Sequence, residues 1–408
     1  MNRSTLRLYG LRMAGSIYRA VQPATPRVQP SEPRILLIRP DHVGDLLFAT
    51  PALRLLRKAM PHAHLTAMVG PWGEAVLSGN ADLDSLIVCP FPGFSRQPKR
   101  SAVEPYRLLF HWSRVLRKER FDMAIVLRFD HWWGAWLAHA AGIPHRLGHE
   151  VAVCQPFLTR MSPYATEQHE VEQNLSLAQM AVAQLGPAVP QIDYRLAFAV
   201  SDRDTEDVRP LLARCRMDAR RDAVIIHPGA GARVKLWPPE CFASVADLLA
   251  ERHDAQILIT GSMSELDLAW SVSARMRQRA CVVAGDTTLG QLAALFQRAR
   301  LVIGPDCGPL HLATAVGTPT VHLYGPASVR KFGPWPRNDK HIAIMSGRTC
   351  VPCNRLDYRE DELSEHPCMQ DIEPETVVAA AERILASPSP DDSGPLSLHQ
   401  QTPTHHRR

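Results

Sequence analysis

Short apolar runs alternate with helical patterns along most of the chain. The runs have the length of strands, and their continuous apolar character is typical of strands buried on both faces of a parallel sheet. Helical spacing follows the first run, with Leu46, Ala49, Leu53 and Leu56 on one face. Strands that alternate with helices in this way predict βαβ units. The expected strands are residues 34–39, 65–69, 86–88, 122–127, 223–227, 256–260, 281–284, 301–304 and 320–324.

The alternation breaks near residues 187–202 and then restarts, which predicts two domains of similar size. We therefore expect an α/β protein with two doubly wound, Rossmann-like parallel-sheet domains, each binding ligands beyond the carboxyl ends of its strands. A length of 408 residues agrees with that number of domains. The predicted domains are residues 34–200 and 201–386, preceded by a basic extension with a Pro-rich linker at 1–33 and followed by a disordered tail at 387–408.

The composition is that of a globular protein and excludes wholesale disorder, with 45% hydrophobic and 21% charged residues. The net charge of +5 is small and gives no reason to expect a nucleic-acid partner. The basic residues are concentrated in two segments. Residues 1–31 hold five arginines and no acid, and residues 96–120 hold eight basic and two acidic residues.

Each basic segment has more than one interpretation. Residues 1–31 show helical apolar spacing, so they form an amphipathic helix on an anionic membrane, a transit peptide or a frayed basic extension. Residues 96–120 either attract phosphates and acidic sugars or form a solvated helix face. No apolar stretch is long enough to span a bilayer, which predicts a soluble or peripheral membrane protein. Vesicle flotation of a chain lacking residues 1–31 tests the membrane role, and unchanged binding would exclude that segment as the anchor.

Nine cysteines are scattered along the chain, and no export signal is evident. The odd number and the scatter predict a reducing, cytoplasmic compartment and no disulfide scaffold. Cys350, Cys353 and Cys368 could bind zinc with a fourth ligand such as His366. Three cysteines are an incomplete set for structural zinc, so we expect no metal cofactor, and elemental analysis of the purified protein tests that expectation.

The most informative loop is GPDCGPLH at residues 304–311, between an apolar strand and a short helix expected at 310–316. The start of a helix offers free backbone N–H groups and a partial positive charge, which suit a phosphate. Gly308 would let the backbone approach that phosphate closely. Asp306 would accept hydrogen bonds from sugar hydroxyls or cap the helix. His311 would donate to a phosphate oxygen or be a packed histidine.

The loop after the expected strand at residues 223–227 is a second candidate. Gly229 and Gly231 permit an unusual backbone path near a ligand, and Lys235 supplies a cation just before the next helix. A pyrophosphate fits this set, although a glycine turn with solvated bases has the same pattern. Glu265, after the following strand, would hold a pair of ribose hydroxyls or act as a first-turn helix acid.

The first half offers one candidate loop, DHVGD at residues 41–45. Asp45, beside Gly44, would face an interdomain cleft, where burial can raise the pKa of a carboxylate toward neutrality and make it a general base. The alternative is an ordinary helix cap. No G-x-G-x-x-G follows either first strand and no G-x-x-x-x-G-K-[ST] occurs, so NAD-dependent redox chemistry and P-loop phosphoryl transfer lose support.

The motifs and their order resemble glycosyltransferase family 9, the ADP-heptose:lipopolysaccharide heptosyltransferases of Gram-negative bacteria. The resemblance covers residues 34–385 and rests on ILLIRPDHVGDLLFATPALRLLRKAMP, HPGAGARVKLWP, GPDCGPLHLATAVGTPTVHLYGP and Cys350-x-x-Cys353 with Cys368-Met369. It implies the GT-B fold, in which two Rossmann-like domains face each other across a cleft. It also implies inverting, metal-independent transfer of heptose from ADP-heptose to an inner-core sugar of lipopolysaccharide.

The resemblance also assigns roles by position. Asp45 would be the general base for the acceptor hydroxyl, with Gly44 and His42 beside it on the acceptor side. The donor would be bound by its phosphates at Lys235, by its ribose at Glu265, and by Gly229, Gly231, Asp306, Cys307, Gly308 and His311. The sequence departs from the family at Cys307, where Thr or Ser is common, and near His42, where a small hydroxyl residue is common. A hydroxyl contact to the donor is thus lost at Cys307, whereas a backbone N–H contact is retained.

The implied partners are a nucleotide-sugar donor, an anionic lipid-linked saccharide acceptor and, peripherally, the inner face of the inner membrane. No nucleic acid and no obligate protein partner are implied, and the expected location is cytoplasmic. Two alternatives stay open: a family member with another nucleotide sugar or a protein or other glycan acceptor, and a non-catalytic carbohydrate-binding scaffold. The intact set of Asp45, Lys235, Asp306 and His311 favours catalysis over the scaffold. A nucleotide-sugar epimerase has less support, because the dinucleotide fingerprint is missing.

Overall fold

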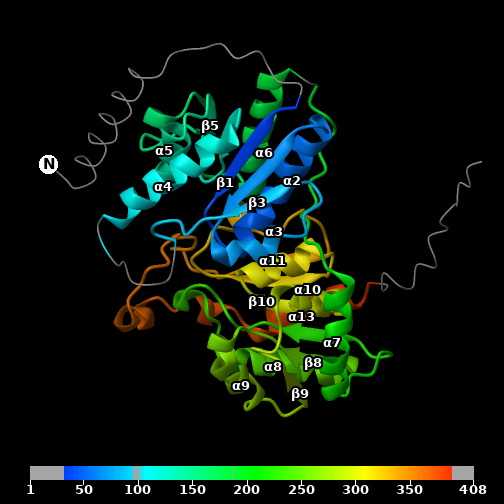
Figure 1. Cartoon of the computed structure of the whole chain (residues 1–408). Helices are drawn as coiled ribbons and strands as arrows, with labels where there is room; N and C mark the ends of the chain where they lie inside the picture. The colour runs from blue at the N-terminus through cyan, green and yellow to red at the C-terminus, as the bar shows by residue number, and fades with distance from the viewer. Residues whose placement is uncertain (1–31, 95–100, 102, 187, 388–408) are drawn as a thin grey trace, which may run out of the picture.

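Two parallel six-stranded sheets form the framework of the computed structural model, which describes residues 32–94, 101, 103–186 and 188–387 (Figure 1). The first sheet has the order β3-β2-β1-β4-β5-β6 and the second β12-β11-β10-β7-β8-β9, with every neighbouring pair parallel. Counted from the first strand of each sheet, both have the strand order of a Rossmann fold. The predicted fold class is therefore confirmed.

The first domain, in the upper part of Figure 1, contains β1 (Arg34–Arg39), α2 (Val43–Ala59), β2 (His64–Val69), α3 (Glu74–Leu77), β3 (Ser85–Val88), α4 (Glu104–Glu119), β4 (Met123–Val126), α5 (Trp132–Ala140), β5 (His145–His149), β6 (Arg160–Ser162) and α6 (Glu170–Leu185). The second domain contains α7 (Asp202–Arg214), β7 (Ala223–Ile226), α8 (Pro239–His253), β8 (Gln256–Ile259), α9 (Leu266–Ser273), β9 (Ala280–Val282), α10 (Leu289–Gln297), β10 (Leu301–Pro305), α11 (Gly308–Ala315), β11 (Thr320–Tyr324), α12 (Val329–Phe332), β12 (His341–Met345) and α13 (Pro374–Leu385).

Strand β1 shows why the apolar runs predict buried strands. Its four central residues are at most 1% exposed. Ile35 and Leu37 face one side and join the apolar cluster of α2 and α6, whereas Leu36 and Ile38 face the other side and join that of α4 and α5. Because successive side chains of a strand point to opposite faces, a strand covered by helices on both sides must be apolar throughout.

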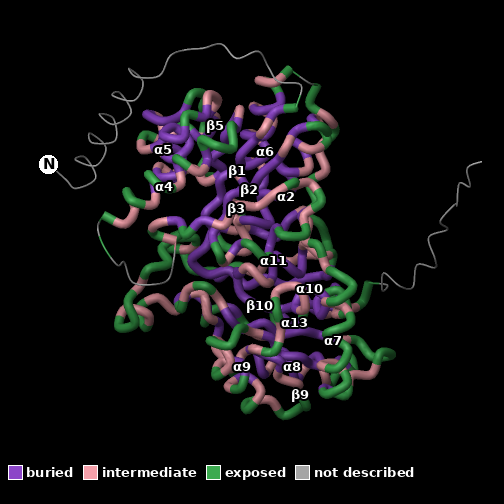
Figure 2. The backbone as a smooth tube through the Cα atoms, in the orientation of Figure 1, coloured by how far each residue is buried: buried purple, intermediate pink, exposed green. Residues whose placement is uncertain are grey.

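The two domains pack against each other through α2 and α11. The apolar cluster that contains Ile35 and Phe48 of the first domain continues into Leu310 and Phe296 of the second. Figure 2 shows buried residues in both domains and in the region around α11 where they meet. The cleft between the domains is thus closed by direct contact at this point.

The structure corrects several expected boundaries. Helix α2 begins at Val43, so Gly44 and Asp45 belong to its first turn and not to a loop, and α11 begins at Gly308, two residues earlier than expected. Strands β5 and β6 carry too little apolar character to predict, whereas β12 has an apolar run, HIAIM, that the sequence analysis did not identify. The break at residues 187–202 falls between the two sheets, but the proposed domain boundaries remain predictions. The basic extension and the tail lie outside the described residues, apart from their inner ends.

A disulfide joins Cys215 to Cys281, 66 residues later in the chain. The fold places their Cα atoms 5.6 Å apart, within the range that a disulfide requires. The sequence analysis expected no disulfide scaffold and did not identify this single pair, because the end of α7 and strand β9 are brought together only by folding. The other seven cysteines are free.

Candidate active site

The predicted site residues gather where the strand order of each sheet reverses, between β1 and β4 and between β7 and β10. Open α/β sheets bind ligands beyond the carboxyl ends of the strands at such points. Asp45 follows β1 in the first sheet. Lys235 follows β7 and Asp306 follows β10 in the second. One site therefore draws on both domains.

Two glycines let the domains approach each other here. A Cβ atom added to Gly44 would stand 3.0 Å from His311 Cδ2 and 3.6 Å from Gly308 Cα. A Cβ atom added to Gly308 would stand 2.8 Å from Val43 Cβ. Because these positions leave no room for a side chain, the close packing of the first turns of α2 and α11 depends on glycine. The structure thus brings together Gly44, Gly308 and His311 as predicted.

Asp45 lies in a group of buried charges at the start of α2. Its Oδ1 accepts a hydrogen bond from Arg39 Nη2 at 3.4 Å, and 32% of its side chain is exposed. The same guanidinium is shared with Asp41 (Nε to Oδ2, 2.7 Å) and Glu170 (Nη2 to Oε2, 3.2 Å). Burial and the nearby Asp41 carboxylate outweigh Arg39 and raise the pKa of Asp45 to about 7. Such a carboxylate can accept a proton from a hydroxyl group.

Lys235 and Asp306 form a buried ion pair on the opposite side of the site. Lys235 Nζ lies 2.5 Å from Asp306 Oδ2, and His311 Nε2 lies 3.4 Å from Oδ1 of the same carboxylate. Burial alone would raise the pKa of Asp306, but Lys235 and His311 outweigh it and hold that pKa well below its usual range. Asp306 is therefore a charged partner of Lys235 and His311, and the helix-cap alternative is wrong, since Cys307 is the N-cap of α11.

Glu265 and Gly229 meet beside this pair. Glu265 ends the short helix Met263–Glu265, and its Oε2 accepts hydrogen bonds from the backbone N–H and the hydroxyl of Ser262, both at 2.7 Å. Its Oε1 lies over Gly229, where an added Cβ would stand only 2.0 Å away. Glu265 is thus a capping acid, and the bare glycine also lets its second oxygen face the loop after β7.

Comparison with known proteins identifies the family. The model of glycosyltransferase family 9 (heptosyltransferase) matches residues 109–363, which is more than half of the chain. The chain belongs to glycosyltransferase family 9. It is therefore a glycosyltransferase, as its motifs predict.

The family 9 relatives are similar over nearly their whole length. The chain is 26% identical over 357 residues to lipopolysaccharide heptosyltransferase 3 of Escherichia coli, covering 84% of this chain and 97% of that protein. It is 25% identical over 371 residues to lipopolysaccharide heptosyltransferase 2 of Escherichia coli K12, covering 86% and 98%. Both relatives are named as heptosyltransferases that act in lipopolysaccharide synthesis.

Solved structures show the same GT-B fold. A family 9 glycosyltransferase from Veillonella parvula superposes with a TM-score of 0.71 and 24% identity over 88% of this chain and 99% of that one. The ADP-heptose lipopolysaccharide heptosyltransferase II of E. coli superposes with a TM-score of 0.67 and 24% identity over 86% and 98%. The expected architecture of two facing Rossmann-like domains is confirmed.

The sequence analysis assigned no role to four charged residues of the candidate site: Arg39, Arg128, Glu170 and Lys331. Arg128 pairs with Asp41, and Lys331 Nζ lies 3.5 Å from Glu170 Oε1. Arg39 and Arg128 could have been found by position, since each stands at or just after the carboxyl end of a strand beside the switch point. Glu170 and Lys331 come from different domains, and only the tertiary structure joins them.

The remaining predicted residues take mixed positions. Cys307 is buried, and burial raises the pKa of its thiol, so its side chain is an inert neighbour of the start of α11. Gly231 is exposed in the loop after β7. His42 is exposed at the start of α2, with its ring centroid 5.3 Å from that of Trp72. Of these three, only Cys307 is packed into the site.

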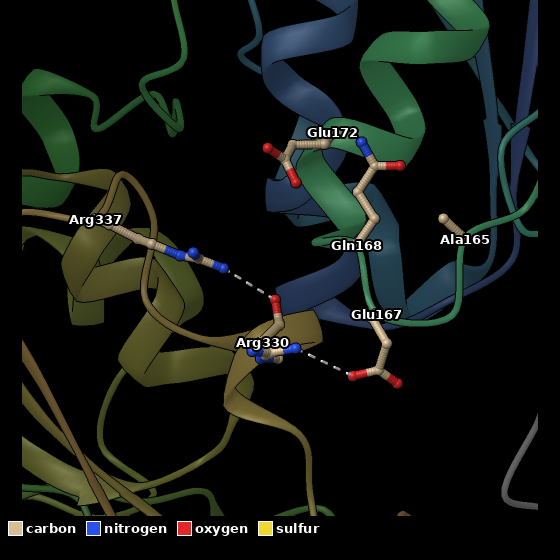
Figure 3. A pocket seen from close by; sticks show the side chains of 6 residues that line it. All are labelled: Ala165, Glu167, Gln168, Glu172, Arg330 and Arg337. Atoms are coloured by element: carbon tan, nitrogen blue, oxygen red, sulfur yellow. Dashed lines mark hydrogen bonds and ion pairs between the residues drawn. The ribbon is translucent and has the colours of Figure 1, made fainter.

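A polar pocket of about 440 Å³ lies between the domains near the start of α6 (Figure 3). Arg330 Nη1 lies 3.9 Å from Glu167 Oε2, and Arg337 Nη2 donates to the backbone oxygen of Arg330 at 3.3 Å. The lining residues are Ala165, Glu167, Gln168, Glu172, Arg330 and Arg337. Glu170 and Lys331 lie within two residues of these lining residues in the sequence. The pocket is therefore close to the carboxylates that share Arg39, which are Asp41, Asp45 and Glu170.

The zinc hypothesis finds no geometric support. The described part of the chain contains no group of three or more His, Cys, Asp or Glu side chains arranged to hold a metal ion. Cys350 and Cys353 are exposed, whereas Cys368 is buried.

No helix among the described residues has both the length and the apolar character needed to cross a bilayer.

We expect Gly229→Ala to weaken ADP binding roughly tenfold. The new methyl group must displace Glu265, which would then lose its predicted hydrogen bond to the ribose. A hydrogen bond to a charged group contributes about that factor to affinity. Calorimetric titration with ADP measures the change. Gly347→Ala is the matched control, since an added Cβ there meets nothing within 4 Å. Unchanged ADP affinity in Gly229→Ala would contradict the predicted contact between Glu265 and the ribose.

Proposed function

We propose that this chain transfers heptose from ADP-heptose to an inner-core sugar of lipopolysaccharide, with inversion at the anomeric carbon and without a metal ion. The observation that supports this most is the position of Asp45 in the first turn of α2, directly after Gly44, which packs against Gly308 and His311 at the start of α11. A carboxylate whose pKa is raised to about 7 would thus lie near a helix start that would bind the donor diphosphate. The names of the family 9 relatives support heptose as the transferred sugar.

The second domain would bind the donor. The N–H groups at the start of α11 and the ammonium group of Lys235 would face the diphosphate, and Glu265 would hold the ribose. Asp306, 2.5 Å from Lys235, holds that ammonium group in place. As the bond between the anomeric carbon and the diphosphate oxygen breaks, these groups would stabilise the negative charge that collects on the departing ADP.

The first domain would bind and activate the acceptor. The acceptor hydroxyl oxygen would attack the anomeric carbon on the face opposite the diphosphate, and its proton would pass to the carboxylate of Asp45. The products are then the new glycoside, ADP and a protonated Asp45, which returns its proton to solvent. Arg39 orients Asp45 but is shared with Asp41 and Glu170, so it does not suppress the basicity of Asp45.

The rate should depend on pH through Asp45. Only its ionised form accepts a proton, so kcat/KM is expected to fall tenfold per pH unit below about pH 7 and to level off above it. Asp41→Asn removes a neighbouring negative charge that raises this pKa, so the acid limb should move to lower pH. A profile that is flat across pH 6–8 (about one unit either side of the expected pKa), or one that Asp41→Asn leaves in place, would contradict the assignment.

Transfer should survive metal removal. Lys235 and the start of α11 would supply positive charge to the diphosphate, so we expect full activity after dialysis against EDTA. The assay is release of ADP with and without the chelator. Activity that is lost with EDTA and regained with added magnesium would show that a metal supplies this charge instead.

The donor class is tested most simply by thermal shift. ADP-heptose is expected to raise the melting temperature more than UDP-sugars or GDP-sugars, because only a ligand that binds the folded state stabilises it. A larger shift with a UDP- or GDP-sugar would favour the alternative of a different donor.

The acceptor would be an anionic saccharide held by lipid at the inner face of the inner membrane, where this chain would act as a peripheral cytoplasmic enzyme.

A further inference from the structure

Helix α4 carries a compact group of exposed apolar side chains. Ten large apolar residues are exposed in the described part of the chain, and three of them lie on α4 or directly before it: Val103 (58%), Tyr106 (54%) and Phe110 (60%). The other seven are spread from Met161 to Leu356. Apolar side chains that gather on one exposed face usually mark a contact surface.

The buried face fixes the orientation of α4, and the three exposed apolar side chains lie roughly a quarter-turn around the helix from it. Leu109, Ser113 and Leu116 are buried against the first domain, at the spacing of one side of a helix. The backbone oxygen of Pro105 accepts a hydrogen bond from Trp133 Nε1 of α5 at 2.9 Å. The exposed apolar face is therefore held outward by the fold.

Basic residues follow the apolar group along α4, toward the C-terminal end of the helix. Residues 104–120 contain five basic and two acidic residues, and one of the acids, Glu119, is paired with Arg34 at 3.1 Å. The guanidinium of Arg114 stacks over the Phe110 ring at 4.2 Å. A hollow of about 650 Å³ at the end of the helix is lined by Arg114, Arg117, Lys118 and Arg120. Aromatic rings with cations around them are the pattern of a helix that lies in the surface of an anionic membrane.

The topology places this face next to the site. Helix α4 connects β3 to the parallel strand β4, so it begins at the carboxyl edge of the sheet, where Asp45 also lies. Figure 1 shows α4 along one flank of the first domain. A membrane in contact with α4 would therefore lie beside the edge of the cleft that takes the acceptor.

We propose that α4 is the surface by which this protein docks on an anionic phospholipid membrane, with Tyr106 and Phe110 in the interface and the basic residues on lipid phosphates. A soluble anionic saccharide would need the cations but not the exposed apolar group. A second copy meeting this face through a twofold axis would bring the same cations together. This inference depends on the proposed function in one respect, which is that the acceptor is held by a lipid.

Flotation of the full chain with vesicles tests the proposal. We expect binding to equimolar phosphatidylglycerol and phosphatidylcholine that weakens with salt, and little binding to phosphatidylcholine alone. Tyr106→Ser/Phe110→Ser and Arg114→Gln/Lys118→Gln should each weaken binding about tenfold. The controls on the second domain, Trp270→Ser and Arg203→Gln/Arg209→Gln, change equally exposed residues and should bind as the wild type does.

The outcomes separate docking from catalysis. Unchanged vesicle binding in both α4 variants would overturn the proposal, as would loss of transfer to a water-soluble acceptor with vesicle binding retained, which would make the surface a saccharide site. Reduced binding with normal transfer to a water-soluble acceptor supports it. If the wild type binds vesicles through α4 but transfers no heptose, the proposed function fails and the docking surface stands.

Discussion

Replacing Asp45 with asparagine is expected to lower heptose transfer by roughly 10²–10⁴-fold, the contribution of a general base. Asparagine keeps the shape of the side chain but cannot accept the proton, and the proposed donor site lies on the other domain. ADP affinity should therefore stay close to that of the wild type. Steady-state transfer rates and calorimetric titration with ADP measure the two quantities separately.

The stability of the Asp45→Asn variant distinguishes loss of a base from loss of structure. The surroundings raise the pKa of Asp45 to about 7, so they disfavour its charge, and removing the charge should not lower the melting temperature. Asp207→Asn changes a partly exposed carboxylate on α7 and should leave transfer unchanged. Near-normal turnover in Asp45→Asn would exclude Asp45 as the base.

Replacing Lys235 with methionine is expected to lower transfer on the order of 100-fold or more, because the positive charge that would stabilise the departing diphosphate is lost. It also leaves the Asp306 carboxylate buried without its partner at 2.5 Å. Removing one member of a buried pair costs about 3 kcal/mol of the free energy of unfolding. Chemical denaturation and the transfer assay measure these two effects in the same variant.

The double variant Lys235→Met/Asp306→Asn separates stability from donor binding. With no buried charge left unpaired, most of the lost stability should return. Transfer and ADP affinity should remain low, since the cation is still missing. If transfer recovers together with stability, Lys235 supports the fold through Asp306 and takes no part in binding the donor.

The strands that could be predicted are those that form a run of mostly apolar residues in the sequence. Strands β1 and β11 match residues 34–39 and 320–324 because helices cover both faces and most of their buried positions are apolar. Strand β5 reads HRLGH and β6 reads RMS, so neither has an apolar run to recognise. Strand β6 lies at the edge of its sheet and is mostly exposed, so it needs no apolar run. Strand β5 is an inner strand whose buried positions include Arg146 and His149, so its sequence does not reveal its burial.

The candidate site was predictable where its residues directly follow strands. Asp45 and Asp306 could be found because each lies just beyond an apolar run, where a Rossmann-like domain binds its ligand. The sharing of Arg39 with Glu170 could not, because the two residues lie 131 positions apart and meet only after α6 packs on α2. Burial contributes most to the raised pKa of Asp45, and Asp41, Arg39 and Glu170 modify it, so the chemistry of the proposed base depends on tertiary structure.

The most direct test of the proposed function is transfer itself. The purified chain is incubated with ADP-heptose and a lipopolysaccharide core that lacks its last inner-core heptose, and the acceptor is weighed by mass spectrometry. We predict that the acceptor gains one heptose for each ADP released, and that Asp45→Asn produces neither. An acceptor that gains mass only with another nucleotide sugar, or ADP release without any gain, would contradict the proposed function.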